Sequence, residues 1–419
     1  MLPDGYIVGL MGADYSEPEI LRSLTDIGGS IEPIDHALLV TPPSWRPDLT
    51  DKATLAEEVA RIVGYDRIPA VLPTAPPGRG LTRSQRLRRS VAQLLASTGH
   101  TEVLSYPFVS ERANDAFGGS VAGAVAGAVP AIRLANPLDG EAPFLRTSLL
   151  PGLIEIAHRN LSRGLVDLAI YEIGSVFRPE AGARYGSGDL PSGIIRPTGS
   201  ELADLLGSIP PQPLRLGALF TGAAIVKQPG QPGVQHGLAD ALDAARQVGH
   251  ALGATIMARQ GSHHSFHPGR TAELFFGDRR VGFAGELLPA LAGELDLPRV
   301  TAVLELELGL LIELAATEVA PTAIATYPVA TQDLSLVLDA QVSAGEVLSA
   351  IVEGAGPLLE VAHLVDDYRG QGIPVGSKSL TFALRFRALD RTLTAAEATE
   401  AKLAGAAMAA ARFGGSIRE

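Results

Sequence analysis

Three carboxylates gather near the N-terminus, around the run Ser44-Trp45-Arg46-Pro47-Asp48. Asp48 is followed by Glu57 and Glu58 at the start of a predicted helix. Clustered carboxylates suit Mg²⁺, which takes oxygen ligands and often keeps several water molecules. A structural role fits as well, because Thr54 with Glu57 has capping-box spacing and Glu57 with Arg61 has the spacing of an i,i+4 ion pair. The spacing alone leaves both interpretations open.

A second group with metal-binding chemistry is the run His263-His264-Ser265-Phe266-His267. Imidazoles four residues apart would share one face of a helix. Pro268 follows directly, however, and the residue before a proline is displaced from helical geometry. No acidic residue lies within the run. We therefore favour a loop whose histidines form local hydrogen bonds over a metal site.

Motifs of several common enzyme classes are missing from the sequence. It contains no G-x-x-x-x-G-K-[ST] loop, no G-x-S-x-G, no H-E-x-x-H and no EF-hand loop. The nearest approach to a phosphate loop, Gly372 to Ser379, leads into a predicted strand, so no helix N-terminus would face a phosphate there. The residues alone therefore predict no catalytic centre.

The composition restricts the class of protein. The 419 residues predict two or three domains, and 46% hydrophobic with 19% charged residues is a globular balance. A formal net charge of −12 argues against a DNA-wrapping protein, and the absence of cysteine excludes disulfides, zinc fingers and thiolate catalysis. No signal-peptide pattern and no apolar run of roughly 18 residues is present, so we expect a cytoplasmic protein with no membrane span. The glycine-rich stretch 118–129 is predicted to be a loop.

Proline- and glycine-rich segments divide the sequence into three predicted domains, 1–71, 72–315 and 325–419. The first is predicted to be small and α+β, winged-helix-like in its element order, with helices from about residue 17 and near 55–63 and a strand over 37–41. The second has a helix over 85–97 and an irregular, proline-rich insertion over 179–213. Its predicted strands cover 102–108, 131–134, 169–173, 214–220, 272–276, 281–284 and 302–308. These do not alternate with helices, so we expect an antiparallel sheet flanked by helices.

The third domain has the clearest pattern. Its predicted strands cover 334–338, 358–368 and 379–387, and in the last of these Leu380, Phe382, Leu384 and Phe386 alternate with polar or small residues. Capping boxes at Ser343/Glu346 and Thr394/Glu397 begin two helices, and a last short strand follows Gly415. The order β-α-β-β-α-β is that of the ferredoxin-like fold. The whole chain is therefore predicted to be α+β.

Motifs from all three domains, taken in order, resemble one known family. The first domain holds PSWRPD at 43–48, EEVARIVGYD at 57–66 and Ile68-Pro69. The second holds GHTEV at 99–103, NPL at 136–138, LRTSLLPGL at 145–153, EIG at 172–174, HPGR at 267–270 and GFAGE at 282–286. The third holds Tyr327-Pro328, DYRG at 367–370 and RTLT at 391–394. Over essentially its whole length the chain is similar to the C-terminal half of the bacterial phenylalanyl-tRNA synthetase β subunit.

This resemblance implies an (αβ)₂ heterotetramer that joins phenylalanine to tRNA-Phe with ATP. The active site is then expected in the α subunit, and the second domain is expected to be a class II synthetase-like core that is not catalytic and acts as a scaffold. Arg146 lies where a class II enzyme could hold ATP, but no matching set of acidic metal ligands accompanies it. We therefore expect Arg146 to be structural.

The resemblance also implies a Mg²⁺ site with one departure from the family pattern. The family places acidic residues at the positions of Asp48, Thr54, Glu57 and Glu58, and the second of these is threonine here. A hydroxyl is a weaker, neutral oxygen ligand, so we expect a weakened site. Asp51 could substitute after a small shift of the chain, which the spacing does not show.

The third domain resembles an anticodon-binding module and is expected to contact tRNA through one face of its sheet. Arg385 and Arg387 share one side of their strand, opposite Phe382 and Phe386. Two arginines there could contact phosphates, which would position the RNA without reading its bases. An ordinary solvated face explains the same pattern equally well.

The N-terminus departs further from the family pattern. Family members usually carry a tRNA-binding oligonucleotide fold and an editing domain before the first block. We expect the chain to be a fragment without them, unable by itself to clear tRNA that carries tyrosine. Two other classes remain open: a structural or regulatory paralogue that has lost its α partner, and a DNA-binding module. The predicted helix with Glu57, Glu58 and Arg61 offers no basic face, which argues against DNA.

Overall fold

The computed structural model describes residues 1–418 except 75, 79, 118–130, 181, 187–189 and 317–323. The predicted loop over 118–129 thus lies outside the described residues. The chain divides into two compact units, Met1–Gly80 and Leu81–Glu419. The predicted domain limits at 71/72 and between 315 and 325 remain a prediction. In the part of the chain that is described, no helix is both long and apolar enough to cross a membrane.

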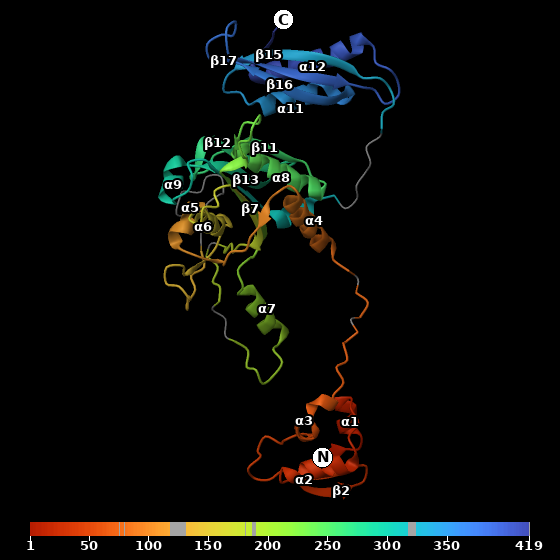
Figure 1. The fold of residues 1–419 in the computed structure, drawn as a ribbon. Helices are drawn as coiled ribbons and strands as arrows, with labels where there is room; N and C mark the ends of the chain where they lie inside the picture. The colour runs from red at the N-terminus through yellow and green to blue at the C-terminus, as the bar shows by residue number, and fades with distance from the viewer. Residues whose placement is uncertain are drawn as a thin grey trace. The chain divides into compact units, whose positions relative to one another are not determined.

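The first unit is a small α+β fold (Figure 1). Its helices are α1 (Tyr6–Met11), α2 (Glu17–Asp26), α3 (Lys52–Val63) and the 3-10 helix η1 (Tyr65–Arg67). Strands β1 (Leu2–Pro3), β2 (Ser30–Ile34) and β3 (Ala37–Thr41) pair antiparallel in the order β1-β3-β2. Leu24 of α2 and Val59 of α3 are fully buried in the core between helices and sheet. The predicted helices and the strand at 37–41 are found, whereas α1, β1 and β2 were not predicted.

A seven-stranded sheet forms the centre of the second unit, in the order β11-β12-β13-β14-β8-β7-β4. Its strands are β4 (Thr101–Glu102), β7 (Leu168–Ser175), β8 (Leu214–Thr221), β11 (Ile256–Gln260), β12 (Phe266–Phe276), β13 (Arg279–Leu287) and β14 (Thr301–Leu306). All neighbours pair antiparallel except β4, which runs parallel to β7 at the edge. The antiparallel sheet predicted from the sequence is thereby confirmed. The predicted strands at 102–108 and 131–134 are wrong in extent. Of the first, only Glu102 pairs with this sheet, while Phe108 pairs with Leu145 in a separate ribbon. Of the second, only Arg133 forms a single bridge.

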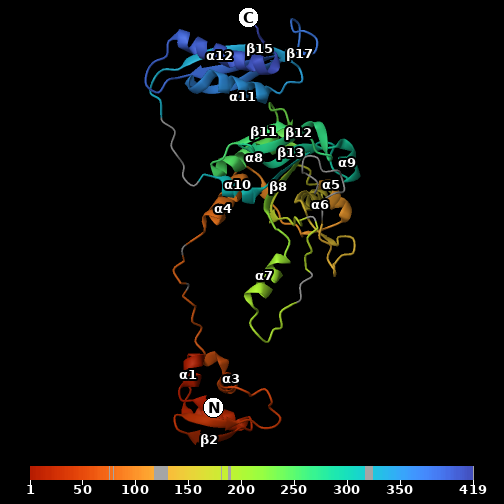
Figure 2. The same cartoon turned by 180° about the vertical axis from the view of Figure 1, so that it is seen from behind.

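Helices cover both faces of this sheet, which makes three layers (Figures 1 and 2). One face packs against α4 (Arg83–Ser97), α8 (Leu238–Leu252) and α10 (Leu308–Leu314). The other packs against α5 (Glu111–Phe117), α6 (Leu150–Leu161) and α9 (Pro289–Glu294). Alternate residues of one strand serve the two cores, as with Ala218 and Leu219 of β8. Both faces are therefore buried, which explains why the strands read as nearly continuous apolar runs.

The remaining elements of this region are short. Two small ribbons pair β5 (Phe108–Val109) with β6 (Phe144–Leu145), and β9 (Ala223–Ile225) with β10 (Val234–Gln235). The helix α7 (Gly199–Gly207) lies in the predicted proline-rich insertion between β7 and β8, and none of its residues is buried. This places α7 outside both cores.

The C-terminal region has the predicted ferredoxin-like order. It runs through β15 (Ala330–Asp339), α11 (Ala344–Ala355), η2 (Gly356–Leu358), β16 (Leu359–Tyr368), β17 (Ser377–Phe386), α12 (Ala395–Phe413) and β18 (Ser416–Ile417). The strands form an antiparallel sheet in the order β16-β17-β15-β18. Phe382 and Phe386 are fully buried against α11 and α12. The capping box of Thr394 with Glu397 is confirmed, whereas Ser343 occupies its helix start without a capping hydrogen bond.

Candidate functional site

The predicted metal-binding residues of the first unit lie on α3 and on the loop that precedes it. Asp51 is the N-cap of α3, where its Oδ1 accepts hydrogen bonds from the backbone N–H groups of Ala53 (2.7 Å) and Thr54 (3.0 Å). The capping box is therefore Asp51 with Thr54, and the predicted box of Thr54 with Glu57 is wrong. The Thr54 hydroxyl donates to the carbonyl oxygen of Asp51 at 2.8 Å. Both residues are thus engaged in starting the helix.

Two guanidinium groups hold the carboxylates of Asp48 and Glu58. Arg46 Nη2 lies 2.6 Å from Asp48 Oδ2 and 2.8 Å from Glu58 Oε1, and Arg61 Nη2 lies 2.6 Å from Glu58 Oε2. Hydrogen bonds from Arg46 and then Arg61 lower the pKa of Glu58 to about 2, and those from Arg46 lower the pKa of Asp48. The predicted pair of Glu57 with Arg61 is replaced by the pair of Glu58 with Arg61. Glu57 instead accepts a hydrogen bond from the Tyr65 hydroxyl.

This arrangement does not fit a Mg²⁺ ion. Asp48 and Glu58 are each paired with arginine, Thr54 is turned to its own helix start and Glu57 faces Tyr65. Within the described ranges, no three histidine or acidic residues come together as a metal ion would require. We assign no metal chemistry to this cluster. The metal site predicted from the sequence, with Asp48, Thr54, Glu57 and Glu58 as ligands, stays a prediction.

The histidine run precedes and opens β12 and forms local contacts. His263 stacks on Phe266 with ring centroids 4.1 Å apart, and its Nδ1 accepts the backbone N–H of Ser265 at 3.2 Å. His264 Nε2 lies 3.1 Å from the carbonyl oxygen of Asp115, and His267 Nδ1 accepts the N–H of Gly269 at 3.1 Å. The three imidazoles therefore point to different partners. The predicted local hydrogen bonds are found for His263 and His267, whereas His264 contacts a residue distant in sequence and His267 lies in β12 rather than in a loop. Burial, and to a smaller degree His264, lowers the pKa of His263 from 6.5 to about 3.

This buried histidine predicts an acid-sensitive stability. The folded state keeps His263 neutral while the unfolded chain binds a proton below about pH 6.5. The contribution of the neutral His263 to the free energy of unfolding is thus complete above pH 6.5, and it is lost as the pH falls from about 6.5 towards 3. Between pH 7.5 and 5.5, urea unfolding should show a loss of about 1.4 kcal/mol from this residue, which H263F should not show. A difference in the free energy of unfolding between wild type and H263F that is the same at pH 7.5 and pH 5.5 would contradict this prediction.

The face of the seven-stranded sheet under α6 carries a buried ion pair. Arg146 Nη1 lies 2.8 Å from Glu172 Oε1 of β7 and 2.9 Å from Ser105 Oγ, which in turn donates to Glu172 Oε2 at 2.6 Å. Arg146 and Glu172 are only 5% and 2% exposed. Glycine makes room for these groups, since a Cβ on Gly174 would collide with Arg146 and one on Gly152 with Ser105. Arg146 therefore has the structural position expected from the sequence.

A second buried ion pair lies on the same face. Arg215 Nη1 of β8 lies 2.8 Å from Glu305 Oε2 of β14, and Arg215 Nη2 lies 3.1 Å from Glu307. Glu305 Oε1 accepts hydrogen bonds from Ser148 Oγ at 3.0 Å and from the backbone N–H of Leu149 at 2.6 Å, directly before α6. The carboxylate thus fixes the start of α6 on the sheet. Sequence analysis did not single out Arg215 or Glu305, although each is a charge inside an otherwise apolar strand.

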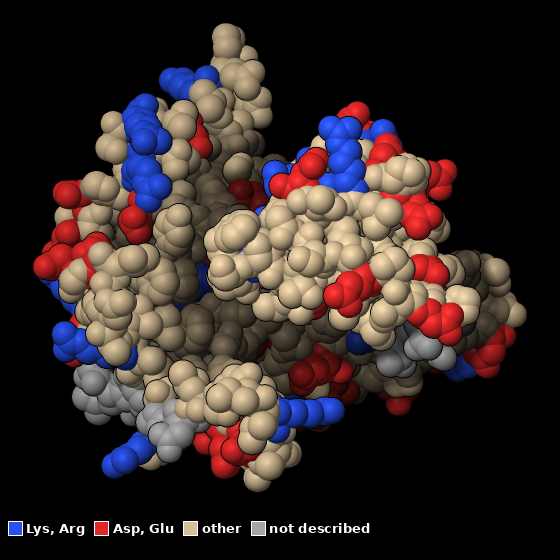
Figure 3. Space-filling view, turned by 90° about the horizontal axis from the view of Figure 1, so that it is seen from below, with Lys and Arg blue, Asp and Glu red and all other residues tan. Residues whose placement is uncertain are grey.

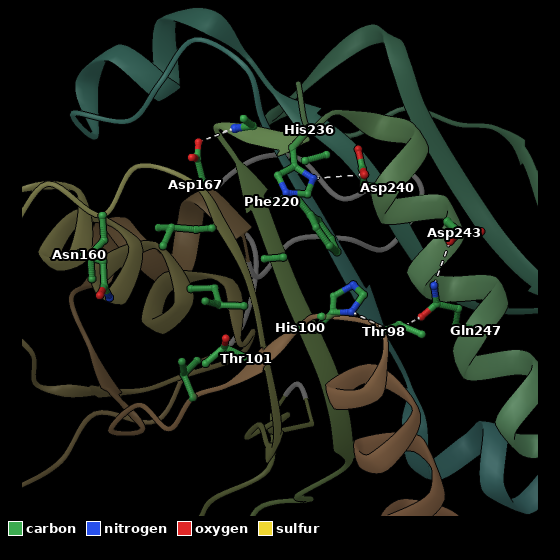
Figure 4. A pocket seen from close by; sticks show the side chains of 18 residues that line it. Thr98, His100, Thr101, Asn160, Asp167, Phe220, His236, Asp240, Asp243 and Gln247 are labelled. Carbon is green, nitrogen blue, oxygen red and sulfur yellow. Dashed lines mark hydrogen bonds and ion pairs between the residues drawn. The ribbon is translucent and has the colours of Figure 1, made fainter. Parts of the chain in front are cut away.

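A pocket of about 640 Å³ opens at the end of β7 and β8, beside α4 and α8 (Figure 4). The Phe220 ring separates His100 and His236, with centroid distances of 5.6 Å and 5.8 Å. Asp167, Asp240 and Asp243 line the same pocket. Burial lowers the pKa of His100, so this imidazole is neutral at physiological pH. Three carboxylates beside a neutral imidazole repel an anion, which argues against a nucleotide phosphate in this pocket.

Much of the polar chemistry of this pocket joins its walls together. Asp167 accepts the backbone N–H of Ala223 at 2.6 Å, and Asp243 accepts the side-chain amide of Gln247 at 2.9 Å. The Thr98 hydroxyl donates to Gln247 at 2.7 Å, which links the end of α4 to α8. These contacts are drawn as dashed lines in Figure 4. We therefore interpret these groups as structural: their hydrogen bonds hold the helices and the sheet together.

The predicted RNA-contacting arginines lie at one end of β17. Arg385 Nε is 2.7 Å from Glu360 Oε2 of β16, and Arg387 Nε is 3.4 Å from Glu360 Oε1. Their side chains are 47% and 20% exposed. The structure thus brings both arginines together, around one acidic residue that the sequence analysis did not include. Arg387 also donates to the carbonyl oxygen of Ala325 at 2.9 Å, which anchors it to the backbone.

An aromatic residue on the same open face was missed from the sequence. The pairing of Tyr368 with Ser379 places it on the side of the sheet that carries Arg385, away from Phe382. Tyr368 is 37% exposed, and the Arg418 guanidinium lies 5.4 Å from its ring centre. The sequence feature that could have indicated this residue is its position at the end of the strand that became β16. Such a ring offers a flat surface on which a base can stack.

Charges on the face of the molecule drawn in Figure 3 are mixed in sign. On the face drawn in Figure 3, Lys and Arg groups lie among Asp and Glu groups and are separated by wide uncharged areas. This agrees with the formal net charge of −12.

The sequence matches the models of three domain families, in the order in which the folds occur. Residues 2–65 match the tRNA synthetase B5 domain, residues 68–308 the phenylalanyl-tRNA synthetase beta chain CLM domain, and residues 325–418 the ferredoxin-fold anticodon-binding domain. A pyrrolysyl-tRNA synthetase from Desulfitobacterium hafniense is a structural neighbour with 14% sequence identity and a TM-score of 0.37, covering 73% of this chain and 95% of its own.

Curated relatives carry one name. The phenylalanine–tRNA ligase beta subunit of Leifsonia xyli subsp. xyli is 59% identical over 421 residues, which cover 100% of this chain and 49% of that protein. The corresponding subunit of Thermobifida fusca is 45% identical, over 99% of this chain and 50% of that protein. The chain spans about half the length of the relatives it matches. Since the beta chain CLM domain alone matches residues 68–308, more than half of the sequence, the chain belongs to the phenylalanyl-tRNA synthetase beta chain family.

Proposed function

We propose that this chain works in the cytoplasm as part of the beta subunit of a phenylalanine–tRNA ligase. The complete enzyme would contain two alpha and two beta subunits and would attach phenylalanine to tRNA-Phe with ATP and Mg²⁺. The alpha subunit would carry the active site. This chain would supply a scaffold that holds the alpha subunit and a surface that contacts tRNA.

The observation that carries the scaffold proposal is the closed face of the seven-stranded sheet. Arg146, Glu172, Arg215 and Glu305 are each at most 5% exposed there, and they neutralise one another in pairs. A substrate site needs polar groups that are free to contact the substrate. Here the four groups are bonded to one another, and Glu305 also fixes the start of α6, so they stabilise the fold instead of binding a nucleotide.

The connection from β4 to β5 supports a docking role. Leu104 and Tyr106 are 82% and 84% exposed, while Ser105 between them is turned inward to Glu172 and Arg146. This connection follows β4, which ends the sheet. Large apolar side chains on a rigid, extended segment at a sheet edge are typical of a protein interface. We assign this segment to the alpha subunit.

Co-purification with the alpha subunit of the same organism tests the proposal. Light scattering should give the mass of two alpha and two beta chains, and charging of tRNA-Phe should require both proteins. A chain that is folded but stays monomeric at micromolar concentration, with no effect on charging, would contradict it. Such a result would favour a paralogue that has lost its partner.

The tRNA surface would lie on the open face of the C-terminal sheet. Arg385 and Arg387 could reach phosphates, and Tyr368 could stack on an unpaired base. Glu360 competes with RNA for both arginines, because its carboxylate already contacts each of them. We therefore expect this surface to bind tRNA only moderately.

Substitutions of this ion pair should change the affinity for tRNA in opposite directions. R385A removes one cation, and we expect tRNA-Phe binding to weaken roughly 3- to 10-fold with a salt slope lower by about one. E360Q frees both arginines and should strengthen binding by a similar factor. Filter binding at several salt concentrations measures both effects. R412A, which breaks the exposed pair of Arg412 with Glu353 between α12 and α11, is the matched control and should leave binding unchanged. Equal affinities for R385A and R412A would exclude this surface.

A further inference from the structure

The loop before α3 carries a guanidinium between two acidic side chains for which the family resemblance implies a metal. Arg46 Nη2 is within hydrogen-bond distance of both Asp48 Oδ2 (2.6 Å) and Glu58 Oε1 (2.8 Å), and Arg46 Nε is 2.9 Å from Asp48 Oδ1. A cation that bridges the two carboxylates would need this same space. The side chain of Glu58 is only 8% exposed, so little room remains on its outer side.

The charges in this cluster balance without a metal. Asp48 and Glu58 contribute two negative charges, and Arg46 and Arg61 contribute two positive charges in direct contact with them. A divalent ion entering here would meet two guanidinium groups at close range and would have to displace at least one. The remaining predicted ligands do not compensate, because Thr54 donates to the Asp51 carbonyl oxygen and Glu57 faces Tyr65.

The position of Arg46 is fixed by its backbone as well as by its side chain. The N–H of Arg46 donates to the carbonyl oxygen of Pro43 at 3.0 Å, and the carbonyl oxygen of Arg46 accepts from Leu49 at 3.4 Å. This turn brings the guanidinium over α3, and its side chain is only 23% exposed. The ion pair with Glu58 thereby ties the loop to the helix.

We propose that Arg46 is the resident cation of this carboxylate cluster and that the first unit keeps its structure without a divalent metal. The Thr54 departure from the family pattern agrees with this, since the hydroxyl serves the helix start. The inference goes beyond the proposed function and does not depend on it, because it concerns only how the first unit is held together.

A Mn²⁺ titration of the full chain tests the metal-free cluster. Mn²⁺ binds where Mg²⁺ does, and its paramagnetic resonance signal decreases when it is bound. Wild type and D48N should give the same titration, and any binding that D48N leaves unchanged lies elsewhere on the chain. Saturable binding that D48N abolishes would overturn the proposal. In the complex with the alpha subunit, wild type and D48N should likewise give equal Mn²⁺ titrations, and binding that D48N abolishes there would also overturn the proposal.

The fluorescence of Trp45 during thermal unfolding gives a second test of the metal-free cluster. It is the only tryptophan in the sequence, and its ring lies against Gly28 within the first unit. Removal of the guanidinium in R46Q should lower the unfolding midpoint seen by its fluorescence by roughly 5 °C or more, and EDTA should leave the wild-type midpoint unchanged. R22Q, which breaks the exposed pair of Arg22 with Asp26 in the same unit, is the control and should have no effect. An R46Q midpoint equal to that of R22Q, or a wild-type midpoint that falls with EDTA, would overturn the proposal.

Discussion

Replacement of Glu305 by alanine is expected to destabilise the second unit by about 3–5 kcal/mol, the range measured when one partner of a buried ion pair is removed. The Glu305 side chain is 1% exposed and its partner Arg215 is 4% exposed, so water cannot replace the lost carboxylate. Three donors would lose the Glu305 carboxylate together: Arg215 Nη1, the Ser148 hydroxyl and the backbone N–H of Leu149. The Arg215 guanidinium would keep only its contact with Glu307. The start of α6 would be released from the sheet.

Urea unfolding followed by far-ultraviolet circular dichroism measures this loss. Trp45 fluorescence supplies an internal reference, because the only tryptophan belongs to the first unit and its transition should not move. E155A is the matched control on the same helix, since Glu155 forms an exposed pair with Arg159 whose removal should be close to neutral. A stability of E305A equal to that of E155A would contradict the structural role of the pair.

A double variant separates the cost of an unpaired charge from the net value of the pair. Substitution of Arg215 by methionine together with Glu305 by leucine removes both buried charges and leaves only the half-exposed Glu307 without its partner. Such replacements of buried pairs are often neutral or stabilising. We expect recovery of part of the loss only. Ser148 and Leu149 would still lack the acceptor that Glu305 provides, so the start of α6 would remain weakened.

The sequence predicts the C-terminal fold almost completely because its signals are local. In β17, Leu380, Phe382, Leu384 and Phe386 occupy alternate positions and all face the helices. Thr394 and Glu397 mark the start of α12 through hydrogen bonds that span only three residues. Alternation and capping need no knowledge of distant partners. The predicted elements therefore match the observed ones.

Predictions fail where the deciding partner is distant or where two local solutions compete. The segment 102–108 was predicted to be one strand, but its two ends pair with different partners: Glu102 pairs with β7, and Phe108 pairs with Leu145 of β6. At α3, both Asp51/Thr54 and Thr54/Glu57 have the spacing of a capping box. The helix begins at Lys52, which makes Asp51 the N-cap and decides the choice.

The candidate site shows the same limit. The carboxylates of Asp48 and Glu58 were found from their type and spacing, but not the arginine between them, since the contact requires the loop to fold back over α3. The pairs of Arg146 with Glu172 and of Arg215 with Glu305 join residues 26 and 90 positions apart. A charge in an apolar strand indicates that a buried partner exists, but spacing does not identify it.

Substitution of both Leu104 and Tyr106 by aspartate is expected to weaken assembly with the alpha subunit at least about 100-fold, or 2.7 kcal/mol. Both side chains are more than four-fifths exposed, so they contribute little to the folded chain itself. A partner that covers them would have to desolvate two carboxylates in the variant without a matching cation. Tyrosine is also among the residues that most often dominate binding energy.

The buried network explains why this segment can dock without a large ordering cost. Val103 donates its N–H to the carbonyl oxygen of Tyr171 at 2.8 Å, and Ser105 is fixed by Glu172 and Arg146, so the backbone between them is held in place. Leu104 and Tyr106 are therefore presented outward in a fixed orientation, and preorganisation of this kind reduces the entropy lost on binding.

Mass photometry and a titration with labelled alpha subunit measure the effect, and V375D serves as the control. Val375 is fully exposed in the turn between β16 and β17, so its substitution also adds a carboxylate to the surface without touching the docking segment. We expect V375D to assemble like wild type, while the double variant stays folded, unfolds at the wild-type urea concentration and remains unassembled. Equal dissociation constants for the double variant and V375D would move the interface away from the edge of the sheet. E305A acts on folding, whereas the double variant of Leu104 and Tyr106 acts only on assembly. The two variants therefore separate the stability of the scaffold from its binding to the alpha subunit.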